Sequence, residues 1–134
     1  IRICLVGSEM CIRDRVRATI EAVAYQTFDL FEAMKHDGLR PKIVKVDGGM
    51  VMNNWFSQFL SDIVNVKVLR PKVQETTALG AAFMAGLQIG VYKSLKDISK
   101  NWNLDKKFSP KMKNKSRSTL IKGWEKAVKR ALIN

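Results

Sequence analysis

A pair of glycines stands between a predicted strand and a predicted helix, in the stretch VKVDGGMVMNN, residues 44–54. Because glycine has no side-chain bulk and adopts positive φ readily, Gly48 and Gly49 would let a ligand lie against the backbone. The first amides of the helix would be unpaired donors at the positive end of its dipole, which suits an anion. Asn53 offers both an amide donor and an acceptor to a sugar or a base. These residues fit a phosphate or nucleotide site, although a glycine pair is equally typical of a tight turn.

Other chemistry finds less support in the sequence. The chain has neither the GxxxxGK[ST] phosphate loop nor the GxGxxG dinucleotide motif, which disfavours a Rossmann oxidoreductase. Cys4 and Cys11 lie seven residues apart, and the one histidine, His36, lies on a different segment. Since a zinc site needs about four ligands in close groups, we interpret both cysteines as unpaired thiols. We therefore predict that these residues form no metal site.

The elements that must position the glycine pair follow from the hydrophobic pattern and its breakers. Apolar residues at helical spacing predict a first helix over 16–34, which stops at Gly38. A short helix is possible at 94–100. The remaining predicted elements, in chain order, are a strand at 42–47, a helix at 51–64, a strand at 66–71, a helix at 76–90 and a helix at 117–132.

Several of these helices carry specific expectations. We predict that Thr76 or Thr77 caps the helix at 76–90, whose small residues allow close packing. The predicted core residues of the other helices comprise Val16, Ile20, Val23, Ala24, Phe28, Phe31 and Met34, then Met52, Trp55, Phe56, Phe59, Leu60 and Ile63, and finally Leu120, Ile121, Trp124, Val128 and Leu132.

A strand, a helix and a strand within about 30 residues predict a βαβ unit with parallel strands. Two parallel strands cannot stand alone, so the sheet needs further partners, inside the chain or lost from it. In open α/β sheets, ligands favour the crevice at the carboxyl ends of the strands, which is where the glycine pair lies.

Composition and charge bound the class of protein. The chain has 134 residues, of which 46% are hydrophobic, and this suits one soluble domain. It contains no apolar run of about 18 residues and no signal-peptide pattern, so we expect no integral membrane segment and a cytoplasmic setting. The net charge is +12, and residues 101–134 contain ten Lys/Arg against two acidic residues. A solvated basic face is the favoured interpretation, and a small nucleic-acid-binding module is the alternative from another class.

Four motifs occur in the order and at the spacing of a known family: DGGxxxNN from residue 47, QxxSDI from residue 58, the RP at 70–71, and ETTALGAA from residue 75. With RATIEAVAYQT (17–27) and GWEKAVKRAL (123–132), they make residues 16–134 similar to the C-terminal end of the FGGY carbohydrate kinases. These belong to the actin/Hsp70/hexokinase ATPase superfamily. The ETTALGAA run resembles the glycerol kinases more than xylulokinase- or gluconokinase-like members, which stay open as the alternative.

The resemblance implies a fold and a site. The fold would be α/β, as part of an actin-like, ribonuclease H-like ATPase domain. Gly49 and Asn53 would contact ATP, while Gly48 and Asp47 would shape the same loop. The helix at 76–90 would pack its small residues beneath the nucleotide cleft. We interpret the aromatic residues after Asn53 as core, not as a stacking platform for a base.

The resemblance also implies the reaction of a complete enzyme, which is transfer of the ATP γ-phosphoryl group to glycerol with Mg²⁺ and assembly as a homo-oligomer. The catalytic aspartate, the Mg²⁺ ligands and the glycerol site would all lie upstream of this chain. Alone, the chain would be inactive and marginally stable. The segment FSPKMKNKSR (108–117) has no acidic residue where some bacterial members support a regulatory partner, so we do not expect that regulation.

Residues 1–15 contain none of these family motifs. They are similar to the translated sequencing adaptors found at the ends of truncated reading frames. We therefore predict that 1–15 is a non-native segment and that 16–134 is the C-terminal part of the kinase nucleotide-binding domain. A genuine extension is the alternative.

Overall fold

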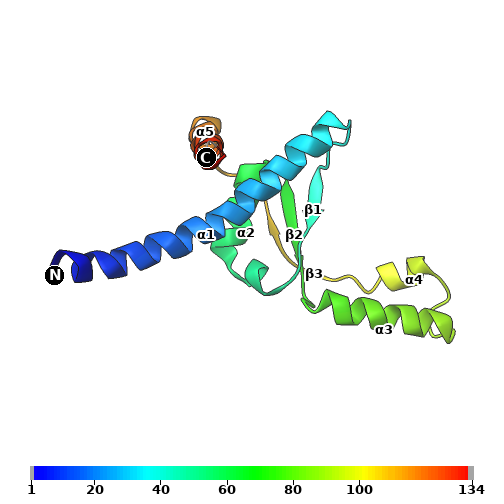
Figure 1. The fold of residues 1–134 in the computed structure, drawn as a ribbon. Helices are drawn as coiled ribbons and strands as arrows, with labels where there is room; N and C mark the ends of the chain where they lie inside the picture. Colours follow the sequence, from blue (N-terminus) through cyan, green and yellow to red (C-terminus); the bar gives the residue numbers. More distant parts are fainter. Residues whose placement is uncertain (1, 133–134) are drawn as a thin grey trace.

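The computed structural model describes the backbone of residues 2–132 and the side chains of residues 11–132. The helices are α1 (Arg2–His36), α2 (Asn54–Val64), α3 (Thr76–Gln88), α4 (Leu95–Ser99) and α5 (Asn114–Ala131), with a 3-10 turn, η1, at Gly49–Met52. The strands are β1 (Ile43–Lys45), β2 (Lys67–Pro71) and β3 (Leu104–Phe108), as Figure 1 shows. The predicted α/β class and the order of the predicted elements are confirmed.

The sheet has the strand order β1-β2-β3. β1 and β2 are parallel with α2 between them in the chain, which confirms the predicted βαβ unit. β3 was not predicted, and it pairs antiparallel with β2, with an irregular register at Arg70 and Pro71. One of the missing partners of the parallel pair therefore lies inside the chain. The other edge of β1 has no partner strand among the described residues.

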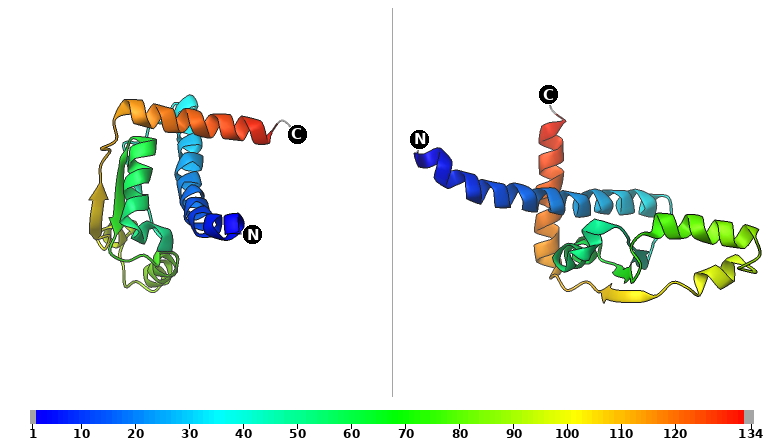
Figure 2. Two further views of the ribbon diagram at one scale, coloured as in Figure 1. Left: turned by 90° about the vertical axis from the view of Figure 1, so that its left-hand side faces the viewer. Right: turned by 90° about the horizontal axis from the view of Figure 1, so that it is seen from below.

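The helices form two layers on one face of the sheet. α2 packs on β2 and β3, and α1 packs on α2, while α5 starts near the end of α2 and crosses the middle part of α1 (Figure 2). No helix among the described residues covers the opposite face of the sheet. The buried hydrophobic residues are Ala24, Tyr25, Phe28, Phe31, Val51, Phe56, Phe59, Leu60, Ile63, Val64, Val68, Phe108 and Ile121. The core therefore centres on α2, the helix that follows the glycine pair.

The predicted core is wrong at four positions, because Val16, Met52, Trp55 and Leu132 are exposed. Met52 ends the 3-10 turn, before the regular spacing of α2 begins. Trp55 stacks on Phe59 with ring centroids 5.1 Å apart, and its other neighbour is the guanidinium of Arg17, 5.7 Å from the ring centroid, so the indole stays partly in solvent. Val16 lies in the first half of α1, beside the exposed Trp55, and Leu132 is the C-cap residue just after α5.

Helix α1 begins earlier than the hydrophobic pattern predicted. It runs without a break from Arg2, so its predicted start at residue 16 is wrong. The predicted stop is confirmed, since Gly38 has φ of +86° and the amide of Leu39 donates to the Met34 carbonyl at 2.8 Å. Cys11 is an exposed thiol, and the side chain of Cys4 lies outside the described part. That residues 1–15 are non-native stays a prediction.

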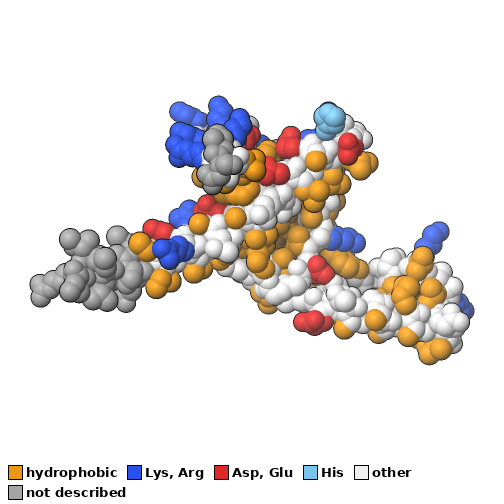
Figure 3. All heavy atoms as spheres, in the orientation of Figure 1, with side chains coloured by type: hydrophobic (Ala, Val, Ile, Leu, Met, Phe, Trp, Pro, Cys, Tyr) orange, Lys and Arg blue, Asp and Glu red, His pale blue; other side chains and the backbone are white. Residues whose placement is uncertain are grey.

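Helices α3 and α4 form an arm that projects from one end of the sheet (Figure 1). Gly86 is the buried residue of α3, and the alanines of that helix are exposed. Hydrophobic side chains gather on the visible face of this arm, as Figure 3 shows. Packing of the small residues beneath a cleft would need groups outside this chain, and it stays a prediction.

Positive charge gathers on a different part of the surface from the arm. Lys and Arg side chains gather on α5, seen at the top of Figure 3. Across residues 2–132, no helix combines the length and the apolar character needed to cross a membrane.

Candidate functional site

The glycine pair turns the chain at the carboxyl end of β1. Gly48 has φ of +88°, a conformation that strains any other L-residue. Gly49 does not adopt positive φ, and a Cβ atom built on either glycine would meet nothing within 4 Å. The backbone therefore requires glycine at position 48, whereas no packing inside the described chain requires it at 49. The open side of Gly49 leaves room for a ligand or a neighbouring segment.

Asn53 lies at the boundary between η1 and α2. The helix predicted over 51–64 would contain it, and the structure instead makes it the N-cap residue of α2. Its Oδ1 atom accepts hydrogen bonds from the backbone amides of Trp55 at 3.0 Å and Phe56 at 3.3 Å. The acceptor is thus occupied by the cap. The exposed side chain keeps its Nδ2 donor, for which the described residues provide no partner.

A small hollow of about 210 Å³ lies beside the turn, where β1 and β2 end. Its lining includes Lys45, Asp47, Thr76 and Trp102. The ammonium of Lys45 lies 4.1 Å from the centroid of the Trp102 ring, a cation–π contact. The Thr76 hydroxyl donates a hydrogen bond to the Asp47 carboxylate. This edge of the sheet therefore presents mixed charge and one aromatic face next to the glycine pair.

Two features of this hollow correct or extend the predictions. The N-cap residue of α3 is Glu75, without a side-chain cap, so the prediction that Thr76 or Thr77 caps the helix is wrong. Thr76 instead connects α3 to the loop after β1. Trp102 was not predicted as a site residue, because it lies in a lysine-rich stretch about 55 residues from the glycine pair and reaches the hollow only through the pairing of β3 with β2.

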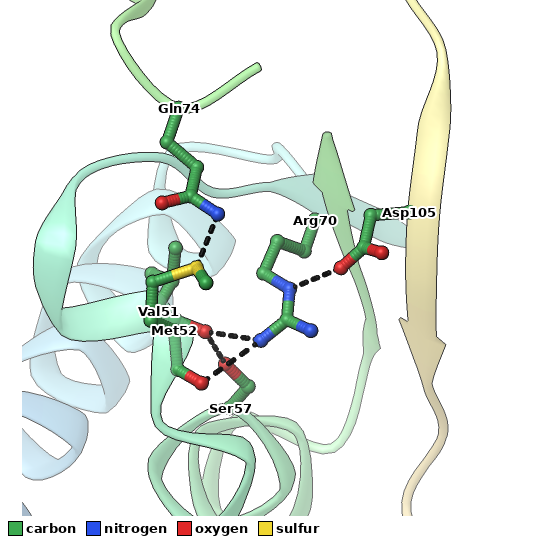
Figure 4. Close-up of polar contacts among 6 residues, drawn as sticks. All are labelled: Val51, Met52, Ser57, Arg70, Gln74 and Asp105. Carbon is green, nitrogen blue, oxygen red and sulfur yellow. Dashed lines mark hydrogen bonds and ion pairs between the residues drawn. The ribbon is translucent and has the colours of Figure 1, made fainter. Parts of the chain in front are cut away.

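The far end of the turn is held from beneath by Arg70 (Figure 4). The side chain of Arg70 is almost fully buried, and its Nη1 donates to the carbonyls of Val51 at 2.8 Å and Met52 at 3.2 Å. Its Nε donates to Asp105 Oδ2 at 2.7 Å. The buried hydroxyl of Ser57 donates to the same Val51 carbonyl at 2.8 Å. Arg70 belongs to the RP motif at 70–71, for which the sequence predicted no role.

The carboxylate of Asp62 holds two parts of the fold together. Its Oδ1 atom accepts from the backbone amides of Lys111 at 2.6 Å and Met112 at 3.1 Å, and from Gln58 at 3.1 Å. These bonds attach the loop before α5 to α2. No group of three or more His, Cys, Asp or Glu residues suitable for a metal ion occurs in the part of the chain that the structure describes.

The C-terminal domain model of the FGGY family of carbohydrate kinases matches residues 7–89. The chain belongs to the FGGY family of carbohydrate kinases. The matched stretch contains the whole βαβ unit, the glycine pair and all of α3. It begins inside the segment 1–15.

Relatives within the family include several glycerol kinases. The chain is 55% identical over 118 residues to the glycerol kinase of Thermoanaerobacter pseudethanolicus, which covers 87% of this chain and 24% of that protein. It is 51% identical over 119 residues to glycerol kinase 1 of Pseudomonas aeruginosa, again 24% of that protein. The chain therefore spans about a quarter of the length of these relatives.

Solved structures support the same fold. The glycerol kinase of Plasmodium falciparum, solved with ADP, superposes with a TM-score of 0.75 at 38% identity, over 89% of this chain and 24% of that chain. The xylulose kinase of Lactobacillus acidophilus gives a TM-score of 0.66 at 23% identity, over 87% of this chain and 24% of that chain. The predicted fold, part of an actin-like ATPase domain as in these FGGY kinases, is confirmed.

Proposed function

We propose that the chain is the C-terminal part of an ATP-dependent glycerol kinase and forms one wall of its nucleotide cleft. In the complete enzyme, the γ-phosphoryl group of ATP would pass in line to a hydroxyl of glycerol, giving glycerol 3-phosphate and ADP. The observation that carries this proposal is the open glycine turn at the carboxyl edge of the sheet, in a chain more than 50% identical to glycerol kinases. Homo-oligomer assembly and a cytoplasmic setting belong to the same proposal.

Each proposed contact residue would have a distinct part. Gly48 would make the sharp turn, and Gly49 would leave space for the polyphosphate or ribose to approach the backbone. Asn53 would donate from Nδ2 to the nucleotide, because its Oδ1 atom already caps α2. The Asn53 cap would in turn hold the donor in a fixed direction.

The described residues do not fit a Mg²⁺ site of their own, since they contain no suitable group of metal ligands. We assign no catalytic base to this chain either, because its most buried aspartate, Asp62, is occupied by the loop before α5. We propose that the Mg²⁺ ligands, the catalytic aspartate and the glycerol site lie in the other three-quarters of the parent enzyme. The isolated chain would then have no kinase activity.

The test uses a chimaera in which residues 16–134 of this chain replace the matching C-terminal quarter of the Thermoanaerobacter pseudethanolicus glycerol kinase. Asn53→Ser keeps a neutral capping acceptor and loses the amide donor, whereas Asn53→Ala loses both. We expect Asn53→Ser to raise the KM for ATP about tenfold, which corresponds to one lost hydrogen bond of about 1.4 kcal/mol. The KM for glycerol should stay within about twofold.

The neighbouring Asn54→Ala variant is the matched control, since Asn54 is also exposed and has no part in the cap. An unchanged KM for ATP in both Asn53 variants, with ATP turnover intact, would remove the site assignment.

The acceptor of the parent enzyme is a separate question, because this chain supplies none of the proposed acceptor site. A xylulokinase- or gluconokinase-like enzyme is the alternative. The identity of 38% to a glycerol kinase structure, against 23% to the xylulose and gluconate kinase structures, favours glycerol. Assaying the complete parent enzyme against glycerol, xylulose and gluconate decides between them, and phosphorylation of xylulose or gluconate alone would overturn the glycerol proposal.

A further inference from the structure

Arg70 has the environment of a residue that holds something in place. It extends from the central strand β2, and 6% of its surface is exposed, although it carries a permanent charge. Burial of a guanidinium costs free energy unless its N–H groups find hydrogen-bond acceptors. Here the partners are one carboxylate, from Asp105, and two backbone carbonyls, from Val51 and Met52 (Figure 4).

The two carbonyls are the important part of this arrangement. They belong to the last two residues of η1, and the carbonyls at the end of such a turn have no partner within it. The Val51 carbonyl also accepts from the buried hydroxyl of Ser57 on α2. Arg70 on β2 and Ser57 on α2 therefore both donate hydrogen bonds to the same end of the turn. Gly49 is the first residue of the turn, and Asn53 is the first residue after the turn.

Asp105 fixes the guanidinium itself. It lies on β3, and its Oδ2 atom is 2.7 Å from the Nε atom of Arg70. This orientation directs Nη1 toward the turn. The planar fork of arginine allows one side chain to bond a carboxylate and two carbonyls at once, and a lysine ammonium on a flexible stem does not reproduce that geometry.

We propose that Arg70 is a positioning residue for nucleotide binding. It holds the turn of residues 49–52 against β2, so that Gly49 and Asn53 face the nucleotide. Arg70 acts through the turn and does not touch ATP. Asp105 and Ser57 complete the clamp, defined as Arg70, Asp105 and Ser57. This inference rests on the proposed function, since it assigns the clamp to the ATP-binding step.

The experiment uses the same chimaeric enzyme and three substitutions. Arg70→Lys keeps the charge and loses the fork, Arg70→Met keeps the apolar stem alone, and Asp105→Asn keeps an oxygen while it removes the ion pair. Lys107→Met is the matched control, because Lys107 is an exposed cation on the same strand as Asp105. Two quantities are measured, the steady-state constants for both substrates and the hydrogen exchange of the amides of residues 49–53.

We expect Arg70→Lys to accelerate exchange in residues 49–53 and to raise the KM for ATP about tenfold, with the KM for glycerol within about twofold. Asp105→Asn should raise the KM for ATP by about threefold, as expected for a half-exposed ion pair. Lys107→Met should change neither quantity. A merely structural arginine would lower the amount of folded enzyme and leave both KM values of the folded fraction unchanged.

Failure of the inference is distinguishable from failure of the proposed function. ATP should protect the amides of residues 49–53 in the unsubstituted chimaera, and absence of that protection would overturn the proposed function. If ATP protects them and Arg70→Lys changes neither their exchange nor the KM for ATP, the clamp is overturned. Should Arg70→Met fail to fold, Arg70→Lys and Asp105→Asn still decide.

Discussion

Helices α2 and α3 are both rich in apolar residues, and their surroundings differ sharply. α2 buries Phe56, Phe59, Leu60 and Ile63 between α1 and the sheet. α3 buries only Gly86 among the described residues and shows Met84 and its alanines to the outside. An apolar helix that finds no cover within its own chain is typical of a surface that packs against other protein. The body, defined as α1, α2, α5 and the sheet, thus has a buried core of its own, whereas the arm of α3 and α4 does not.

The largest expected difference between the two regions is in stability. Ile63 is 0% exposed, and Ile63→Ala should lower the free energy of unfolding by about 2–5 kcal/mol, because it opens a cavity in the core. Met84 on α3 is 52% exposed, and Met84→Ala should change the free energy by less than about 0.5 kcal/mol. Urea unfolding of the chain, followed by circular dichroism, measures both. Equal losses at the two sites would contradict the comparison.

Two glycines of α3 sharpen the comparison within the arm itself. A Cβ atom on Gly86 would lie 2.9 Å from the ring of Tyr92, so Gly86→Ala should cost about 1–3 kcal/mol. A Cβ atom on Gly80 would meet nothing within 4 Å, so Gly80→Ala should stabilise the chain by up to about 1 kcal/mol through helix propensity.

The same Gly80→Ala substitution in the chimaeric enzyme tests whether α3 is covered there. A gain in the chain together with a loss in the chimaera would show that a neighbour packs against the small face of α3. A gain in both would show that this face stays open.

Alkaline pH should loosen the body. Burial, with help from the nearby Glu21 carboxylate, raises the pKa of Tyr25 to about 12. Since the ordinary pKa is 10.0, the folded chain keeps the phenol proton at a pH where the unfolded chain has lost it. The stabilisation is fully present below pH 10 and is lost as the pH rises toward 12. In an alkaline titration, tyrosinate absorbance should therefore show a component that appears above pH 10, and Tyr25→Phe should remove this component. A component above pH 10 that survives Tyr25→Phe would contradict the assignment.

Acid should destabilise helix α4 in the arm, and this is the smallest of the expected effects. Hydrogen bonds from Lys100 and Ser94 lower the pKa of Asp97 at the start of α4. A lowered pKa means that the contribution is present above the ordinary value of 3.8 and is lost as the pH falls through the folded value. Amide exchange in residues 95–99 should accelerate there, while the amides of α2 stay protected. Uniform acceleration across both helices would contradict two separate regions.

The sequence predicted the elements that local pattern controls. Alternating β-branched residues located β1 and β2, and Gly38 located the end of α1, because each signal acts within a few residues. β3 escaped prediction because LDKKF has two lysines and an aspartate between its apolar ends and no apolar alternation; its pairing with β2 makes it a strand. The start of α1 was misplaced because helical hydrogen bonds continue beyond the apolar stripe.

The candidate site divides in the same way. The glycine pair and Asn53 lie within six consecutive residues of the sequence, so their spacing was sufficient to select them. Arg70 and Asp105 lie 35 residues apart, and their ion pair exists only because β2 and β3 are neighbours. Thr76 had the right residue type for a cap, yet the Asp47 carboxylate provided a competing hydrogen-bond partner. Contacts across the sheet are what the sequence alone did not reveal.

The three tryptophans give this chain its own optical reporters. Trp124 stacks on Tyr25 and donates to Asp29, so its emission follows the packing of α5 on the body. Trp55 stacks on Phe59 just after the glycine turn, and Trp102 stands over the Lys45 ammonium in the hollow at the end of β1. With two of the three replaced by phenylalanine in turn, fluorescence would report separately on the body, the turn and the hollow, without an attached dye.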